Sequence, residues 1–150
     1  NPAGLRLADY FLHVVATPKA RAQAFIIFSE LANDGETSGE LNLGICYEHG
    51  LGTPVDLLKS IHWYHRAADH GSAFAHFNLG AIHTSGRQRI GNNITALTHL
   101  LKAEQLIGKD SSISKTISKY IQRQQPVLTK KLKQQMTLEE ITRAEKQAAR

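Results

Sequence analysis

The histidines are the residues of this chain best suited to metal chemistry. His62 and His65 lie three residues apart in the run HWYH, a spacing that can place two imidazoles on one face of a helix. His70, His76 and His99 are candidates to complete such a site. No carboxylate converges on them in the sequence pattern, so we interpret these histidines as solvated helix surface. No metal site is predicted.

Cys46 is the only cysteine, so no disulfide can form within the chain. Its place beside Tyr47 favours a small buried hydrophobe over a nucleophile. A lone cysteine is compatible with a reducing compartment and does not exclude an oxidising one. The sequence contains no G-x-S-x-G, phosphate-binding glycine loop or H-E-x-x-H. We therefore expect no enzyme and no cofactor.

A pattern with a spacing of 36 residues organises the first two thirds of the chain. Its recurring members are Leu7-Ala8, Leu43-Gly44 and Leu79-Gly80, then Thr17-Pro18 and Thr53-Pro54, then Gly35 and Gly71. A fixed period of this length indicates stacked copies of one supersecondary unit, none of which buries its apolar face alone. Binding is therefore a better functional expectation than catalysis.

Each copy is predicted to be two helices joined by a turn. In the middle copy, Leu43 and Tyr47 share one helical face, and Leu57, Ile61 and Tyr64 share another. The turn between them is the glycine-rich run HGLGTP at 49–54. We place the three repeats at about 3–36, 37–72 and 73–108. The third copy is degenerate at its turn, residues 86–93, as expected before a cap.

Two further helices are expected after residue 108. The apolar stripe of the first helix ends near Pro126 and is made by Ile113, Ile117, Tyr120 and Ile121. Residues 127–135 extend one helix or link the two, and Thr137 to Glu140 has the form of a capping box. The fold class is all-α: an α-solenoid (superhelix) of about three helix-turn-helix repeats, followed by C-terminal capping helices. We expect about eight helices and no sheet.

The net charge of +5 is concentrated in the C-terminal part of the chain. Residues 1–108 carry eight Lys/Arg against nine Asp/Glu, whereas residues 109–150 carry ten against four. The candidate basic residues are Lys115, Lys119, Arg123, Lys130, Lys131 and Lys133. Their interleaving with isoleucines favours a helix packed on one side and solvated on the other. An acidic protein partner is the first alternative, and nucleic acid or anionic lipid is the second.

The middle copy resembles the Sel-one-like repeat (SLR) family, which is related to the tetratricopeptide repeats. The resemblance rests on Leu43-Gly44, Tyr47, Gly50, Gly52, Pro54, Asp56, Lys59, Trp63-Tyr64, Ala67-Ala68 and Gly71. It extends in part over residues 3–108, and the closing run MTLEEITRAEKQAAR is similar to the last helix of bacterial members. The resemblance implies an adaptor or scaffold. Some members resemble β-lactam-hydrolysing proteins, but those have a disulfide in each repeat.

The resemblance also implies where a partner would bind. In this superfamily the first helix of each pair lines a concave groove. The outward positions of those helices are Leu5, Asp9, Leu12, His13, Leu41, Ile45, Glu48, His49, Phe74, Phe77, Ala81, Thr84 and Ser85. Leu5, Leu41 and Phe77 form an apolar row, which suggests a docked peptide or helix. The alternative is that this row is buried internally or covered by the chain's own C-terminal helix.

These observations predict a noncatalytic protein-interaction module that binds a protein partner. More specific hypotheses are a bacterial adaptor and an immunity protein that inhibits an effector, and a cell-wall enzyme is the competing class. No nucleic acid is expected as a partner. No apolar run reaches the roughly 18 residues of a membrane span. The start at Asn1 suggests a processed chain, with the bacterial periplasm weakly preferred to the cytoplasm.

Overall fold

A computed structural model describes residues 2–85, 92–110 and 115–150. These residues form eight α-helices and one π-helical segment, and none of them lies in a strand. The all-α prediction is therefore confirmed. The chain divides into two compact units, residues 1–70 and 71–150, which we describe separately.

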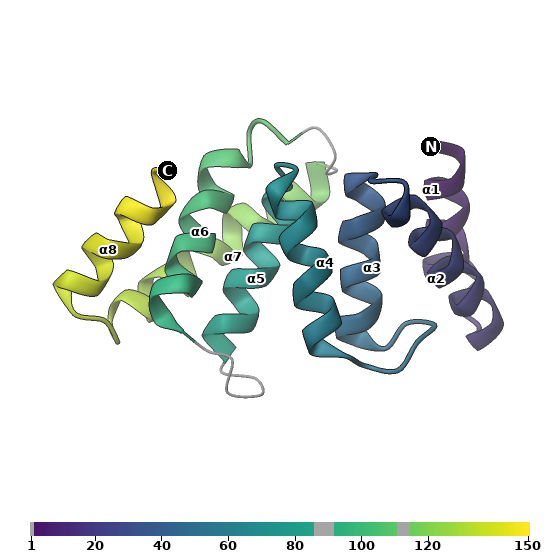
Figure 1. The fold of residues 1–150 in the computed structure, drawn as a ribbon, viewed down its shortest axis with the longest axis horizontal. Coiled ribbons are helices and arrows are strands. Elements are labelled where there is room, and N and C mark those ends of the chain that lie inside the picture. The colour runs from purple at the N-terminus through teal and green to yellow at the C-terminus, as the bar shows by residue number, and fades with distance from the viewer. Residues whose placement is uncertain (1, 86–91, 111–114) are drawn as a thin grey trace. The chain divides into compact units, whose positions relative to one another are not determined.

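Unit 1 holds the first two helix pairs (Figure 1). Its elements are α1 (Pro2–Asp9), η1 (Tyr10–Val15), α2 (Pro18–Asn33), α3 (Thr37–His49) and α4 (Leu57–Asp69). The π-helical turn η1 continues directly from α1. It ends at Ala16, whose left-handed backbone (φ 51°) stops the helix.

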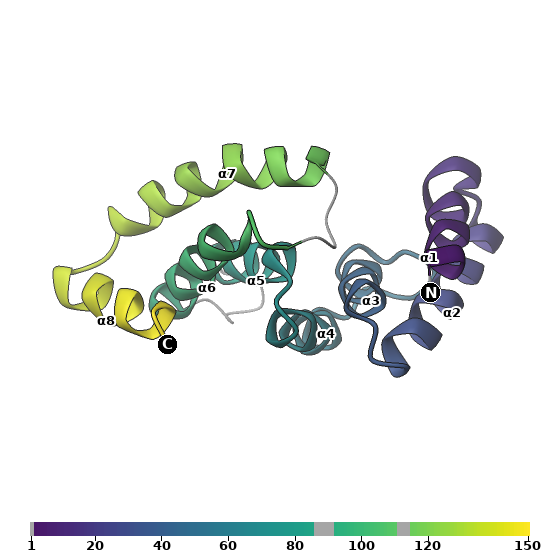
Figure 2. The ribbon, with the colours of Figure 1, turned by 90° about the horizontal axis from the view of Figure 1, so that it is seen from above.

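Unit 2 holds the third pair and the C-terminal helices. Its elements are α5 (Ala73–Ser85), α6 (Asn93–Leu106), α7 (Lys115–Lys133) and α8 (Leu138–Ala148). Helix α7 runs alongside α5 and α6, and α8 packs on α6 (Figure 2). Helix α7 continues through Pro126 to Lys133, so residues 127–133 extend this helix, which is one of the two predicted alternatives. Most of the degenerate third turn (86–91) and Ile113 fall outside the described residues.

Side-chain caps define where several helices begin. The Oδ1 atoms of Asp56 and Asn92 each accept a hydrogen bond, of 3.1 Å, from the backbone N–H three residues later. The two caps lie 36 residues apart, so the repeat period fixes the start of the second helix in copies two and three. In the first copy Thr17 caps α2 one turn earlier, with Pro18 at the first helical position. The predicted capping box at Thr137 and Glu140 is confirmed.

The Leu-Gly pairs of the repeat allow two helices to approach closely. A Cβ atom added at Gly44 would lie 2.6 Å from the Tyr64 ring. In the next copy, a Cβ atom added at Gly80 would lie 2.7 Å from Leu100. Tyr64 and Leu100 are themselves 36 residues apart, so each copy uses the same contact. A side chain at either glycine would force the paired helices apart.

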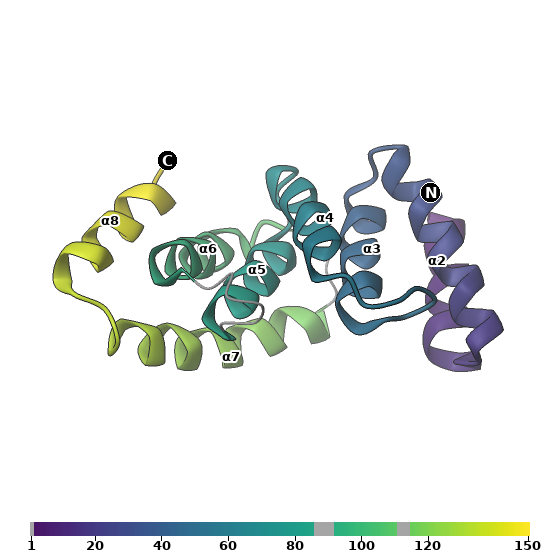
Figure 3. The same ribbon diagram turned by 60° about the horizontal axis from the view of Figure 1, so that its bottom comes forward.

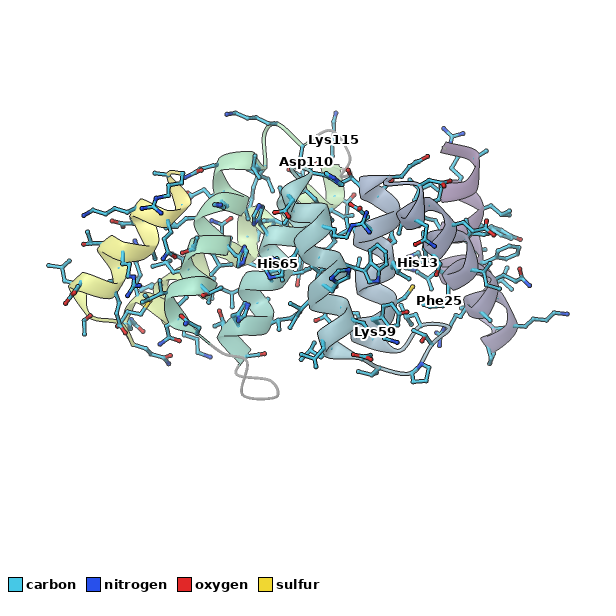
Figure 4. The ribbon with its side chains drawn as sticks, viewed as in Figure 1. His13, Phe25, Lys59, His65, Asp110 and Lys115 are labelled. Atoms are coloured by element: carbon cyan, nitrogen blue, oxygen red, sulfur yellow. The ribbon has the colours of Figure 1, made fainter. Side chains whose placement is uncertain are left out.

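The α3–α4 loop packs against α2 in unit 1 (Figure 3). At Gly52 the backbone has φ +75°, and an added Cβ atom would collide with the carbonyl oxygen of Arg21. Glycine is therefore required here for both its conformation and its size. Tyr47 on α3 is fixed in the same region, since the Phe25 ring lies edge-on to it at 5.5 Å and Lys59 Nζ lies 5.5 Å from its ring centre (Figure 4).

Each unit has its own apolar core. The buried core of unit 1 contains Ala8, Leu12, Ala24, Phe28, Ala32, Leu43 and Cys46. The buried core of unit 2 contains Phe77, Ala96, Leu97, Leu100, Ala103, Ile121, Leu132 and Ala144. The second core draws on all four helices of unit 2, so α7 and α8 are integral parts of its packing. The N-terminus of α5 is also tied to this unit, because Asp110 Oδ2 accepts a hydrogen bond of 2.7 Å from the Ala73 N–H (Figure 4).

Candidate functional site

The first helices of unit 1 leave part of the predicted partner surface accessible. On α3, Ile45 and Glu48 are partly exposed and His49 is exposed. On α1 and η1, Leu5 and Asp9 are partly exposed, and His13 is exposed (Figure 4). The remaining two predicted residues, Leu12 and Leu41, are buried and cannot meet a partner without a change in packing.

Glu48 is fixed in position by a buried neighbour. The Tyr64 hydroxyl donates a hydrogen bond of 2.6 Å to Glu48 Oε2. Burial, and then the charge of Glu48, raise the pKa of Tyr64 well above its usual value, so the phenol stays protonated and acts as donor. His49 Nε2 lies 3.7 Å from the same carboxylate oxygen. The carboxylate is therefore held at the surface in one orientation.

Asp9 occupies the corresponding surface on the first helix. Desolvation by burial raises the pKa of its carboxyl, and the nearby His13 partly opposes that shift. The accessible surface of unit 1 thus combines two apolar side chains, Leu5 and Ile45, with two carboxylates and two histidines.

The equivalent surface of unit 2 is largely covered by the chain itself. Phe77 is 4% exposed, and the ring of Tyr120 on α7 lies edge-on to it with centroids 5.9 Å apart. Phe74 is partly buried and stacks on Phe77 at 6.3 Å. Phe77 is therefore covered by the C-terminal part of the chain, as one of the predicted alternatives has it. Ala81 and Thr84 are partly exposed and Ser85 is exposed, on the last turns of α5.

The basic residues lie on the solvated side of α7. Ile121 and Leu132 on the opposite side are buried in the core of unit 2. Five of the six predicted cations are exposed, and Lys133 is partly buried with its Nζ 3.3 Å from Glu145 Oε1. The predicted division into a packed side and a solvated side is confirmed. None of the described helices combines the length and the apolar composition needed to cross a bilayer.

The histidines of the HWYH run do not assemble a metal site. His62 and His65 are exposed on α4, and Figure 4 labels His65. Within the described ranges, no group of three His, Cys, Asp or Glu side chains has an arrangement suited to a metal ion. The predicted burial of Cys46 is confirmed, and burial raises the pKa of its thiol to about 12.

Two groups of polar residues, each with a buried member, were not predicted from the sequence. In unit 1, Glu40 is fully buried, with its Oε2 2.7 Å from His70 Nδ1 and its Oε1 3.1 Å from Arg66 Nη2. In unit 2, the Nδ1 atoms of His76 and His99 are 2.9 Å apart, so one ring must donate and the other accept. Both rings are buried, so the interpretation of these two histidines as solvated helix surface is wrong. Both groups join residues more than 20 positions apart in the sequence, so no local sequence pattern could predict them.

An exposed apolar stripe on the first helix was also missed. Leu7 is 48% exposed, whereas its equivalents Leu43 and Leu79 are 2% and 0% exposed. Tyr10 and Val14 continue this stripe and are also exposed. Leu43 packs in a core with residues of α2, the second helix of the preceding copy, and Leu7 has no preceding copy among the described residues. Its phase in the 36-residue pattern predicts burial, and only its position at the end of the described array explains its exposure.

Comparisons with known proteins find a repeat family in the second and third of the three predicted copies. The Sel1 repeat family model matches residues 37–72 and 73–106. The chain is 37% identical over 54 residues to a putative sel1-like repeat-containing protein of Acanthamoeba polyphaga mimivirus, which covers 36% of this chain and 10% of that protein.

Two eukaryotic proteins are also similar over parts of the chain. Chitin synthase regulatory factor 3 of Schizosaccharomyces pombe is 35% identical over 78 residues, covering 51% of this chain and 8% of that protein. DAP3-binding cell death enhancer 1 of Mus musculus is 47% identical over 38 residues, covering 25% of this chain and 8% of that protein. The chain thus spans a tenth or less of the length of these relatives.

Solved structures share the fold. The SLR-fold protein c5321, a protective antigen of uropathogenic Escherichia coli strains, aligns with 98% of this chain and 28% of its own length, with a TM-score of 0.80 at 20% identity. A Sel1 repeat protein from Oxalobacter formigenes aligns with 70% of this chain and 43% of its own length, with a TM-score of 0.62 at 24% identity. These likenesses confirm the predicted α-solenoid.

Sel1 repeat proteins generally act in protein–protein interaction, and their fold is typically a noncatalytic scaffold. The chain therefore contains two consecutive Sel1 repeats, at residues 37–72 and 73–106.

Proposed function

We propose that this chain is a noncatalytic interaction module that binds a partner protein on the first-helix surface of unit 1. The observation that carries the proposal is the exposure pattern of α3. Its other faces are packed, with Leu41, Leu43 and Cys46 buried, while Ile45 and His49 keep accessible side chains. A partly exposed isoleucine beside a fixed carboxylate, Glu48, is a surface suited to recognition.

The names of the relatives support a role in binding. One is a regulatory factor of chitin synthase, and another is described as binding DAP3. Each is much longer than this chain, so these names support the class of function and not its partner.

The expected partner segment is an amphipathic helix or an extended peptide. Leu5 and Ile45 offer apolar contacts, and the fixed carboxylate of Glu48 accepts hydrogen bonds from a donor or cation on the partner. The exposed cations of α7 would attract a partner whose remaining surface is acidic, and would raise the association rate at low salt.

A pair of matched substitutions tests this proposal. Ile45→Asp combined with His49→Glu changes the proposed surface, and Leu58→Asp changes an exposed apolar residue on the second helix α4 of the same unit. We expect the double variant and the Leu58→Asp variant both to unfold cooperatively on heating. The unaltered chain should capture a partner from cells of its source, and only the double variant should fail to capture it. Loss of that partner with Leu58→Asp, and not with the double variant, would refute the assignment of the surface.

The same surface would serve an adaptor or an inhibitor such as an immunity protein. The two roles differ in the fate of the partner's activity. Once a partner has been identified, its activity should persist in the complex if the chain is an adaptor and disappear at a one-to-one ratio if it is an inhibitor.

A further inference from the structure

A cavity between α6 and α7 is the most unusual part of unit 2. It has a volume of about 690 Å³, within the range of small-molecule sites, and both helices contribute to its walls. Glu104 and Ile107 line it from α6, and Figure 2 shows α7 running alongside that helix. Three features of α7 around this cavity are unfavourable for folding, and each is described below.

The first feature is Gln125, a polar residue on the packed side of α7. It is 5% exposed and follows the fully buried Ile121 by one helical turn. Its Nε2 donates a hydrogen bond to Glu104 Oε2 that is long, at 3.4 Å. A buried amide with a weak hydrogen bond stabilises a helix interface less than a leucine of similar size. The packing of α7 therefore does not explain the glutamine.

The second feature is Pro126, which lies in the middle of the 19-residue helix α7. Proline has no N–H, so the carbonyl of Gln122, four residues earlier, lacks its helical hydrogen bond. Pro126 and Gln122 both line the cavity. The proline therefore frees a backbone acceptor on a residue that lines the cavity, at the expense of helix stability.

The third feature is the hydroxyl of Thr129, one turn further along α7. Its Oγ1 atom is buried and makes no hydrogen bond with the described residues. Threonine in a helix can satisfy its hydroxyl on the carbonyl four residues earlier, but this one does not. Thr129 also lines the cavity.

These three features lie within eight residues of one helix and surround one cavity. Departures from local folding rules that gather in one place indicate a functional site. The charged residues of the lining then indicate the ligand. Glu104 is an anion, and Lys130 and Lys133 are cations, so the cavity offers both signs of charge.

We propose that the α6–α7 cavity binds a short peptide with free termini. Glu104 would receive the ammonium group and Lys130 the carboxylate. Between them, the Gln122 carbonyl would accept an N–H of the peptide, and the Thr129 hydroxyl would pair with a peptide carbonyl. Ile107 and Pro126 provide apolar contacts for the side chains. This site lies wholly within unit 2 and does not depend on the function proposed for unit 1.

A titration of the full chain with tri-alanine tests the proposal, followed by amide chemical shifts in two-dimensional NMR. We expect saturable shifts at α6 and α7. N-acetylated tri-alanine and tri-alanine amide, which each lack one terminal charge, should bind at least about tenfold more weakly, because each loses one charge pair with the cavity lining. No saturable shift at these helices with tri-alanine would overturn the proposal.

Variants separate a binding role from a structural one. Glu104→Gln and Lys130→Gln should each weaken tri-alanine, while Lys131→Gln, an exposed cation that does not line the cavity, should not. Gln125→Leu should raise the melting temperature, because leucine packs better than a weakly bonded amide at this buried position. A lower melting temperature for Gln125→Leu, together with unchanged tri-alanine binding by Glu104→Gln and Lys130→Gln, would refute the site.

Discussion

The ring of Tyr120 lies edge-on to Phe77, with their centroids 5.9 Å apart, and so connects α7 to the first helix of the third repeat. Phe77 occupies the same repeat phase as Leu5 and Leu41, the row that would line a binding groove. In unit 2 this position is therefore filled by the chain's own helix. Partner binding is better sought on the first helices of unit 1.

This contact leads to a prediction for the stability of unit 2. Phe77→Ala should lower the free energy of unfolding by about 3–5 kcal/mol, because it removes a buried aromatic ring. Tyr120→Ala should cost less, since this ring is half exposed. A double-mutant cycle by denaturant titration should give a coupling of about 0.5–1.5 kcal/mol for the edge-to-face pair. A coupling of zero would mean that α7 does not hold this position in solution.

The buried Glu40 predicts an asymmetric response to substitution in unit 1. Replacing both Arg66 and His70 with alanine leaves a buried carboxylate without a counter-charge, and should cost about 3–5 kcal/mol. Glu40→Gln removes the charge and should cost less, because both its partners are substantially solvated. Chemical denaturation measures both effects, with the exposed Glu30→Gln as control. A larger loss for Glu40→Gln would contradict this order.

The Cys46 thiol predicts how stability changes at alkaline pH. Its pKa is raised from 9.0 to about 12 by burial, so the unfolded chain loses this proton at a lower pH than the folded chain. Stability should therefore fall as pH rises above 9, by up to about 1.4 kcal/mol per pH unit from this group. Tyr64, whose pKa is raised well above 10, adds to this loss at still higher pH.

Cys46→Ala should remove part of that slope between pH 9 and 10, whatever its effect on stability at neutral pH. Thermal unfolding across this range measures the difference between the two proteins. Equal slopes would show that the thiol ionises as readily in the folded chain as in the unfolded one.

Equivalent leucines should respond differently to the same substitution. Leu43→Ala should cost about 2–5 kcal/mol because this side chain is 2% exposed in the core of unit 1. Leu7→Ala, at the same repeat phase and 48% exposed, should cost less than about 1 kcal/mol. Urea titration of both variants gives the comparison. Similar losses would indicate that Leu7 is covered in solution, for example by a second copy of the chain.

The cations of α7 should affect association and not folding. Replacing Lys115, Lys119 and Arg123 with glutamine should change stability by no more than about 0.5 kcal/mol per site, because all three are exposed. Duplex DNA should show no salt-dependent binding to the unaltered chain in a gel-shift assay. A steep salt-dependent affinity that disappears in the triple variant would instead identify α7 as a nucleic-acid surface.

The sequence alone was enough to establish the repeat unit. The period of 36, the Leu-Gly pairs and the turn residues report local requirements: helical periodicity, close helix contact at Gly44 and Gly80, and the left-handed backbone of Gly52. Residues that serve such requirements recur between copies, as Gly44 does in Gly80, so a single sequence displays them. The all-α class and the boundaries of the middle repeat followed from these patterns.

The accessible surface was decided only by the tertiary structure. Exposure depends on what packs against a residue, and for Phe77 that is Tyr120, 43 positions later in the chain. Leu7 and Leu43 are indistinguishable in the repeat pattern, yet Leu43 is buried in a core with residues of α2, whereas Leu7 is 48% exposed. The continuation of α7 through Pro126 has the same origin, because tertiary contacts on both sides of the proline offset its local penalty. Local chemistry therefore determined which helices form, and contacts between distant segments determined which of their side chains can meet a partner.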